Sequence, residues 1–171
     1  ATVDALRTDG VDVVILRDAE ANARAIEAGY EGVETAIAGT NLLQLNSGVM
    51  ITCNGGQPAP QCDGQADGAK VQAQTPTIDR TVRRAIAAAI DPEVVNDRAY
   101  RGAGIASTAL IPPGFPWDPE VDGPKYDPEL AKQLVAEAKS NGWDGTVRLL
   151  VQNAGPTVPT GDAVETMLRA V

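Results

Sequence analysis

The sequence predicts an α/β domain, because short apolar segments with strand character alternate along the chain with amphipathic helices. Residues 11–16 (VDVVIL) form a β-branched run of the kind found in buried strands. Residues 42–46 (LLQLN) alternate apolar and polar side chains from residue 43 on, with the period of two that a strand requires. By contrast, the helix expected after Pro76 carries apolar residues at helical spacing. We therefore expect a mixed sheet flanked by helices.

The other elements follow from the same periodicities and from capping signals. Asp91-Pro92 and Asp127-Pro128 each combine a helix N-cap with a proline at the first helical position. The expected strands span 11–16, 33–38, 42–46 and 146–152, with a loop at 153–160. The expected helices span 2–8, 18–28, the segment from just after Pro76 to 90, 91–100, 127–141 and 161–171. The last of these helices presents Val164, Met167, Leu168 and Val171 on one face.

Length and composition are those of one globular domain. The chain has 171 residues, 43% of them hydrophobic and 22% charged, and this balance excludes a disordered tail and a membrane-embedded protein. The 23 acidic and 14 basic side chains give a formal net charge of −9. Because such a charge repels phosphate groups, we expect no nucleic-acid partner.

Residue types also exclude several kinds of catalytic and metal site. The chain contains no histidine, which excludes Ser-His-Asp and Cys-His catalysis within it and any zinc site that needs imidazole. We therefore expect no enzymatic activity, no cofactor and no metal. The sequence GAGIAS at residues 102–107 is no dinucleotide-binding motif, since it follows a helix and leads into an extended Pro-rich loop.

Residues 47–75 form a region rich in Gly, Gln, Pro, Asp and Asn, which predicts a long peripheral loop or insertion. It contains both cysteines of the chain, Cys53 and Cys62, and we expect them to form a disulfide; two free thiols are the alternative. Closing so short a loop contributes roughly 2 to 3 kcal/mol. Such bonds persist only in oxidising compartments, which favours a location outside the cytoplasm.

Five segments of the chain resemble, in the same order, the peptide and nickel class of solute-binding proteins of ABC importers. Residues 5–13 (ALRTDGVDV) and 42–47 (LLQLNS) are similar to two strand segments of the class's second lobe. Residues 78–91 (IDRTVRRAIAAAID) are similar to its helix Asp-x-x-Val-Arg-x-Ala, and the last two segments are 99–116 (AYRGAGIASTALIPPGFP) and 126–138 (YDPELAKQLVAEA). Only the insertion at 47–75 departs from the usual spacing.

This resemblance implies one lobe of a periplasmic-binding-protein-like (type II) fold in a two-lobed protein that closes on its ligand by a hinge motion. Residues 1–171 would be part of the second lobe, with the remaining parts absent at both ends. The implied function is capture of oligopeptides or dipeptides for the membrane subunits of an ABC permease. The implied protein is a monomer without catalytic activity, located in the periplasm or lipid-anchored at the outer face of the cell membrane.

Candidate ligand contacts follow from topology, because solutes in open α/β folds bind near the carboxyl ends of strands and in the following loops. Asn46 and Asn153 each follow an expected strand, Gln44 shares a face with Asn46, and Trp117 could supply an aromatic wall. For the amides the alternative is a capping role, and for Trp117 it is packing against prolines. Asp79 and Arg83 match family positions, and we expect both to be structural.

Two other functions fit the same composition. A secreted or cell-surface interaction domain without a transport role would share the acidity and the disulfide, and a non-catalytic fragment of an α/β enzyme would share the fold class. The ordered set of five segments favours the solute-binding protein over both.

Overall fold

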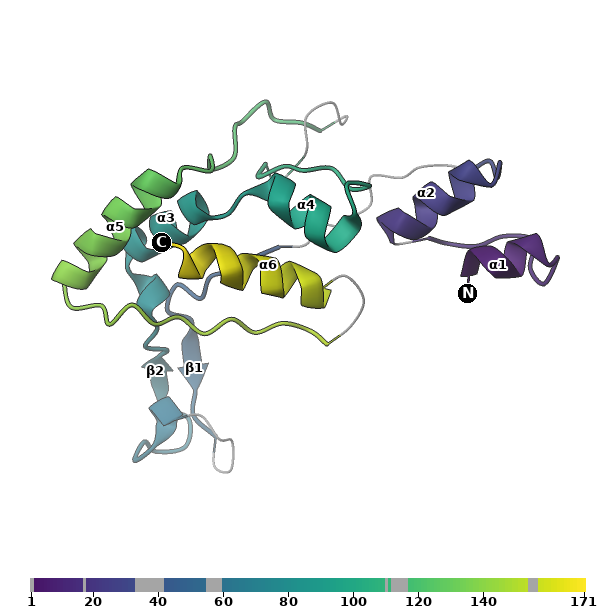
Figure 1. The fold of residues 1–171 in the computed structure, drawn as a ribbon. Coiled ribbons are helices and arrows are strands. Elements are labelled where there is room, and N and C mark those ends of the chain that lie inside the picture. The colour runs from purple at the N-terminus through teal and green to yellow at the C-terminus, as the bar shows by residue number, and fades with distance from the viewer. Residues whose placement is uncertain are drawn as a thin grey trace. The chain divides into compact units, whose positions relative to one another are not determined.

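The computed structural model describes residues 2–16, 18–32, 42–54, 60–109, 111, 117–153 and 157–171. It divides into two compact units, whose helices and strands are labelled in Figure 1. Unit 1 comprises Ala1–Asn41, Ile90–Tyr126 and Leu149–Ala170, and unit 2 comprises Leu42–Ala89, Asp127–Arg148 and Val171. Unit 1 contains helices α1 (Thr2–Arg7), α2 (Ala19–Glu27), α4 (Pro92–Tyr100) and α6 (Thr157–Arg169). Unit 2 contains α3 (Arg80–Ala89), α5 (Pro128–Ser140), strands β1 (Met50–Thr52) and β2 (Lys70–Gln72), and the 3-10 turns η1 (Pro60–Cys62) and η2 (Pro76–Ile78).

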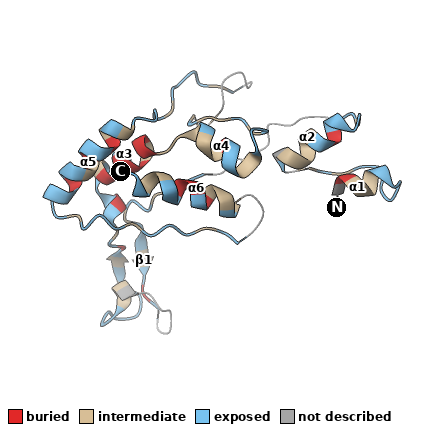
Figure 2. Ribbon diagram, in the orientation of Figure 1, coloured by how far each residue is buried: buried red, intermediate tan, exposed pale blue. Residues whose placement is uncertain are grey.

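The core of unit 2 is the packing of α3 against α5. The predicted apolar stripe of α3 is buried: Val82 is 1% exposed, and Ala85, Ile86 and Ala89 are buried with it, as the red segments of Figure 2 show. On α5 the buried side chains are Ala131, Leu134 and Ala138. Most of these side chains are alanines, which lets the two helix backbones approach closely and makes the seam intolerant of larger residues.

Three helices start at the capping aspartates that the sequence predicts. Asp91 and Asp127 cap α4 and α5: their Oδ1 atoms accept hydrogen bonds from the N–H groups of Glu93 and Leu130, both at 2.9 Å. Asp18 caps α2 in the same way through the N–H of Ala21. Each cap satisfies a backbone donor that a helix start leaves without an intrahelical partner.

Unit 1 contains two helix pairs, α1 with α2 and α4 with α6. In the second pair the Sδ atom of Met167 on α6 accepts a hydrogen bond from the N–H of Asp91, the N-cap residue of α4. Gly161 on α6 allows close contact with Val151, because a Cβ atom there would lie 2.5 Å from a Val151 methyl carbon. The helix thus docks on the preceding segment through a residue without a side chain.

The predicted strands at 11–16, 42–46 and 146–152 are not strands in the structure; these segments have no regular secondary structure. A strand needs a hydrogen-bonded neighbour, and in the described part of the chain the only sheet is β1 with β2. Several of their apolar side chains are accordingly exposed, at 80% for Val13, 83% for Ile15 and 97% for Leu150, whereas others, such as Val14 and Val147, are half-buried. The strand expected at 33–38 lies outside the described residues.

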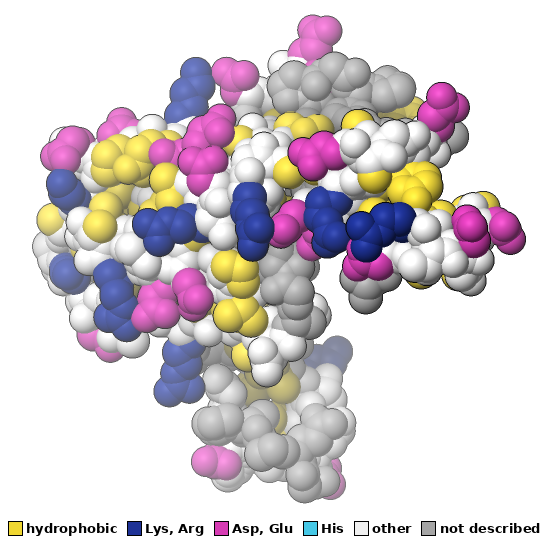
Figure 3. All heavy atoms as spheres, turned by 45° about the vertical axis from the view of Figure 1, so that its right-hand side comes forward, with side chains coloured by type: hydrophobic (Ala, Val, Ile, Leu, Met, Phe, Trp, Pro, Cys, Tyr) yellow, Lys and Arg dark blue, Asp and Glu magenta, His cyan; other side chains and the backbone are white. Residues whose placement is uncertain are grey.

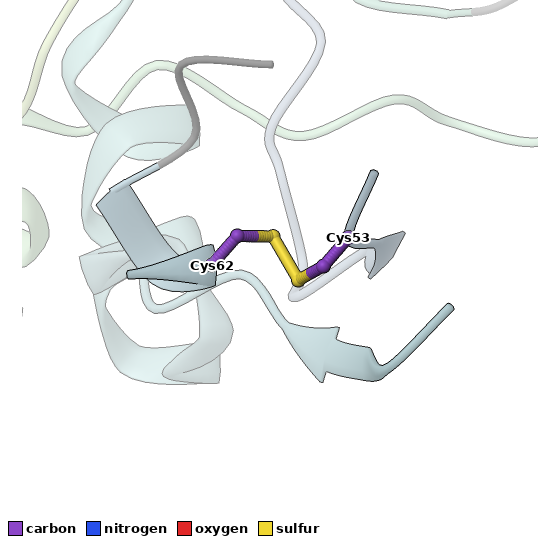
Figure 4. Close-up of a disulfide and its surroundings, with 2 residues drawn as sticks. All are labelled: Cys53 and Cys62. Carbon is purple, nitrogen blue, oxygen red and sulfur yellow. A yellow bond between two sulfur atoms is a disulfide. The ribbon is translucent and has the colours of Figure 1, made fainter. Parts of the chain in front are cut away.

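The two strands instead occur within 47–75, the region predicted to be a loop. β1 and β2 pair antiparallel with Ile51 opposite Val71, and the Cys53–Cys62 disulfide closes the chain beyond β1 (Figure 4). The ladder continues past the strands, since the N–H of Cys53 bonds to the carbonyl of Ala69 and the N–H of Ala73 to that of Val49. The described part of 47–75 is therefore a hairpin at its base and carries the predicted disulfide.

Helix α6 begins at Thr157, four residues earlier than predicted, so the expected loop at 153–160 is partly helical. Pro159 had indicated a loop, but proline is tolerated in the first turn of a helix, where the backbone N–H groups have no intrahelical acceptor. Of the predicted apolar face, Val164 is buried and Met167 and Leu168 are half-buried. None of the helices within the described ranges is both long and apolar enough to cross a lipid bilayer.

The α3–α5 seam gives a direct test of stability. Truncating the fully buried Val82 in Val82→Ala should lower the free energy of unfolding by about 2 kcal/mol, because it removes two buried methyl groups and leaves a cavity. Urea denaturation measures the change. Val121, which is 67% exposed, provides the control, and Val121→Ala should leave the midpoint unchanged; equal effects would contradict a core at the seam.

Removing the disulfide tests whether the hairpin depends on it. The double variant Cys53→Ser/Cys62→Ser should lose roughly 2 to 3 kcal/mol of stability, by the loop-closure argument. Hydrogen exchange should locate that loss. The backbone N–H groups of residues 53 and 69 should exchange faster, and those of α3 should keep their protection. Unchanged exchange in β1 and β2 would show that the strand pairing holds the hairpin without the covalent bond.

Candidate functional site

The four candidate ligand contacts lie on segments of both units. Gln44 and Asn46 belong to the segment that leads into the hairpin of unit 2, whereas Trp117 and Asn153 belong to unit 1. All four side chains are solvent-exposed, Trp117 at 78%. The structure therefore places Gln44 and Asn46 on one continuous segment, and Trp117 and Asn153 on two separate segments.

Asn46 organises the turn at which the chain enters the hairpin. Its Oδ1 accepts hydrogen bonds from the N–H groups of Gly48 and Val49, both at 3.0 Å. This is an Asx turn, in which a side-chain oxygen replaces a backbone acceptor. The capping role weighed for Asn46 from the sequence is therefore present, and the oxygen of this amide is already engaged within the protein.

The same residue is tied through its backbone to the start of α3. The Thr77 hydroxyl, buried in η2, donates to the carbonyl of Asn46 and lies 2.9 Å from the hydroxyl of Thr75. The Nη1 of Arg83, one turn into α3, donates to the carbonyls of Thr77 at 2.8 Å and Ile78 at 2.7 Å. Arg83 is thus structural, as expected. Its guanidinium donates hydrogen bonds to two backbone carbonyl groups that lie just before the start of α3.

Asp79 is structural as well, and its carboxylate also borders a groove. Its Oδ1 accepts from the N–H of Thr81 at 2.7 Å and so supports the first turn of α3. The carboxylate itself is exposed at the edge of a groove that is described below.

Gly48 closes the base of the hairpin against η2. Its φ of +91° is a left-handed conformation that favours glycine. A Cβ atom there would lie 2.7 Å from Nε2 of Gln72 and 3.0 Å from Cγ1 of Ile78. The Gln72 amide also donates to the Gly48 carbonyl at 3.2 Å. Both strands of the hairpin are therefore attached to the same end of α3, a connection that sequence patterns did not indicate.

Surface charge is consistent with the acidic composition. On the face shown in Figure 3, Asp and Glu side chains are distributed among Lys and Arg side chains without a continuous basic area. Across the residues that the structure describes, no cluster of three or more His, Cys, Asp or Glu side chains could hold a metal ion. Polar amides and an indole are the chemistry that the candidate residues offer, and these groups bind by hydrogen bonds and stacking.

Comparison with known proteins shows a match to one protein family and shorter matches to two individual proteins. The family model described as "Bacterial extracellular solute-binding proteins, family 5 Middle" matches residues 1–171. Heme-binding protein A of Haemophilus influenzae is 40% identical over 65 residues, which cover 37% of this chain and 12% of that protein. The dipeptide-binding protein of Escherichia coli is 38% identical over 64 residues, with the same two shares.

These matches cover only 12% of the length of either relative. No solved structure matches the chain. The family match therefore carries the comparison, since it extends over every residue.

Substitution of Arg83, with its neighbour Arg84 as the control, tests whether Arg83 anchors the Asn46 segment. Arg83→Met removes both hydrogen bonds to the carbonyls of Thr77 and Ile78 and should lower the free energy of unfolding by about 1–2 kcal/mol. The matched control is Arg84→Met, because Arg84 is exposed on the other side of the helix and should change stability by less than about 0.5 kcal/mol. Urea unfolding of both variants decides; similar losses would contradict the anchoring role of Arg83.

Proposed function

Because the chain belongs to the bacterial extracellular solute-binding proteins of family 5, we propose that it is part of the second lobe of a two-lobed protein that captures a solute for an ABC importer. The observation that carries this proposal is the family match over residues 1–171. Closure of two lobes on the solute would present the loaded protein to the permease subunits. The protein would work as a monomer and would catalyse no reaction.

Oligopeptides or dipeptides are the solutes that we infer. The similarity to a dipeptide-binding protein supports this class. The candidate residues supply amide donors and acceptors, which match the peptide bonds of such a ligand, and an aromatic ring for its side chains. Free metal ions fit poorly, because this chain has no histidine and both of its cysteines are in the disulfide.

The candidate contacts differ in what they have to offer a peptide. The Asn46 Oδ1 already accepts two backbone N–H groups, so only its NH₂ group is assigned to the solute. Gln44, two residues earlier and also exposed, would supply both its carbonyl oxygen and its NH₂ group. We assign Asn153 as a further polar contact and Trp117 as an apolar wall.

Location follows from the family and the disulfide together. Family 5 proteins are extracellular by description, and the Cys53–Cys62 bond requires an oxidising environment to persist. We propose the periplasm or the outer face of the cell membrane, with a lipid anchor in the latter case.

A second solute has a specific observation in its favour, because the other relative is named as a heme-binding protein. Histidine, a common axial ligand of heme iron, is absent from this chain. Heme binding would therefore depend on contacts of other kinds or on residues outside this chain. An interaction domain without any solute is the remaining alternative.

Thermal unfolding of the complete protein that contains this chain tests these alternatives together. A ligand that binds only the folded state stabilises it by about 2.7 kcal/mol at a concentration of 100 times its Kd. We expect di- and tripeptides to raise Tm, and heme and glucose to leave it unchanged. A rise with heme alone would replace the peptide assignment, and no rise with any solute would refute the binding function in favour of an interaction domain.

Substitution then tests the residue assignments. Gln44→Ala should weaken peptide binding about tenfold, because two hydrogen bonds of about 0.5–1.5 kcal/mol each are lost. Isothermal titration calorimetry measures the Kd. Gln133→Ala, at an exposed position of α5, is the matched control and should bind like the parent protein. Equal affinities of all three proteins would remove Gln44 from the site.

A further inference from the structure

Unit 2 contains a groove at the junction of the hairpin, α3 and α5. Its volume is about 540 Å³, which is within the range of small-molecule sites. One wall comes from residues 74–82, at the end of the hairpin and the start of α3, and the other from residues 138–144, at the end of α5. None of Gln44, Asn46, Trp117 and Asn153 lines it.

The groove places exposed apolar side chains opposite an oriented indole. Pro76 and Ile78 contribute apolar surface to one wall, and Trp143 lies in the other. The Trp143 side chain is held in place, because its Nε1–H donates to the carbonyl of Thr146 at 3.1 Å. With its polar end satisfied, the indole can offer only its ring to a ligand, and an indole face attracts cations.

Two carboxylates line the same groove, one from each wall. Asp79 and Asp144 each use Oδ1 to accept a backbone N–H at 2.7 Å, from Thr81 and Thr146 respectively. Among the described residues neither carboxylate forms an ion pair. Each aspartate is therefore positioned by its own turn and keeps its negative charge uncompensated by a bonded cation.

The positive side chains nearby do not occupy the groove. No lysine or arginine lines it. Arg83 is engaged with the carbonyls of Thr77 and Ile78. Lys139 does not line the groove but extends along Gly145, the residue after Asp144, where its Cε and Nζ lie 2.8 and 3.4 Å from the position that a Cβ atom would take. The C-terminal end of α5, which carries the negative end of the helix dipole, adds to the negative potential.

From this combination we propose that the groove binds a guanidinium or ammonium group, with the apolar part of the ligand against Trp143 and the charge between Asp79 and Asp144. The ligand class is a small organic cation, either free or as an arginine or lysine side chain of a peptide. An inorganic cation is disfavoured, since no three potential ligands cluster among the described residues. The inference is independent of the solute function proposed above.

Fluorescence of Trp143 provides the readout. The chain has two tryptophans, so Trp117→Phe leaves Trp143 as the only tryptophan of this chain. In this background we titrate Nα-acetyl-arginine amide and its neutral analogue Nα-acetyl-citrulline amide, which has nearly the same shape. We expect a saturable change with the arginine compound and at least about fivefold weaker binding of the citrulline compound, because exposed charge pairs and cation–π contacts contribute modestly. No saturable change, or equal binding of both compounds, would overturn the proposal.

Two conservative variants test the carboxylates. Asp79→Asn and Asp144→Asn retain an oxygen that can accept the Thr81 or Thr146 N–H, so the turns should persist while the charge is removed. Each should weaken binding of the arginine compound about three- to fivefold. Asp63→Asn, at an exposed position in the hairpin, changes the net charge equally and should have no effect. If Asp63→Asn weakens binding as much as the other two, the net charge accounts for the attraction and the site is refuted.

A third arm distinguishes the source of the cation. Agmatine represents a free small molecule, and the blocked tripeptide Ala-Arg-Ala represents a peptide side chain. Similar affinities would assign the groove to small cations, whereas tighter binding of the tripeptide would assign it to a side chain presented by a peptide. Failure of both to change the fluorescence of Trp143 would overturn the proposal without affecting the solute function, which is tested by the thermal stability of the complete protein and by Gln44→Ala.

Discussion

The close approach of α3 and α5 is the constraint on which unit 2 depends. Alanines at 85, 88 and 89 face alanines at 131 and 138 in a buried seam, so the two backbones can come near each other without cavities. The N–H of Asp127, the cap of α5, also donates to the carbonyl of Ala88 at 2.8 Å. The hairpin base and both walls of the groove are attached to this pair, and their positions follow from it.

Helices were predictable from the sequence, whereas strands were not. A capped helix satisfies its hydrogen bonds within one segment, so Asp91-Pro92 and Asp127-Pro128 mark α4 and α5 whatever surrounds them. A strand depends on a neighbour elsewhere, and the runs at 11–16 and 146–152 have the composition of strands without such a neighbour in the described chain. Conversely, β1 and β2 have only three residues each, which is too short for a period-two pattern to mark them in a region rich in Gly and Pro.

Features of the candidate site also differ in how far the sequence could predict them. Arg83 was expected to be structural from its place at the margin of the α3 stripe, and the structure agrees. A capping role was one of the two interpretations of Asn46 from the sequence, and the structure shows it; the two N–H groups that the oxygen accepts could not be named, because an Asx turn depends on the conformation of Gly48 as well as on residue type. The groove at Trp143 could not be predicted either, since its two walls are separated by 56 positions in the chain, from Val82 to Ala138, and meet only through helix packing.

The way the hairpin joins unit 2 has a consequence for how the length of the chain can vary at this position. Val49 and Ala73 are hydrogen-bonded neighbours at 2.9 Å, so the 23 residues between them leave and re-enter the protein at almost the same point. Because the hairpin is attached in this way, lengthening, shortening or deleting it does not change how the chain runs through the rest of the protein. Evolution can therefore use this position as a module boundary, where chain is gained or lost without redesign of the surrounding architecture.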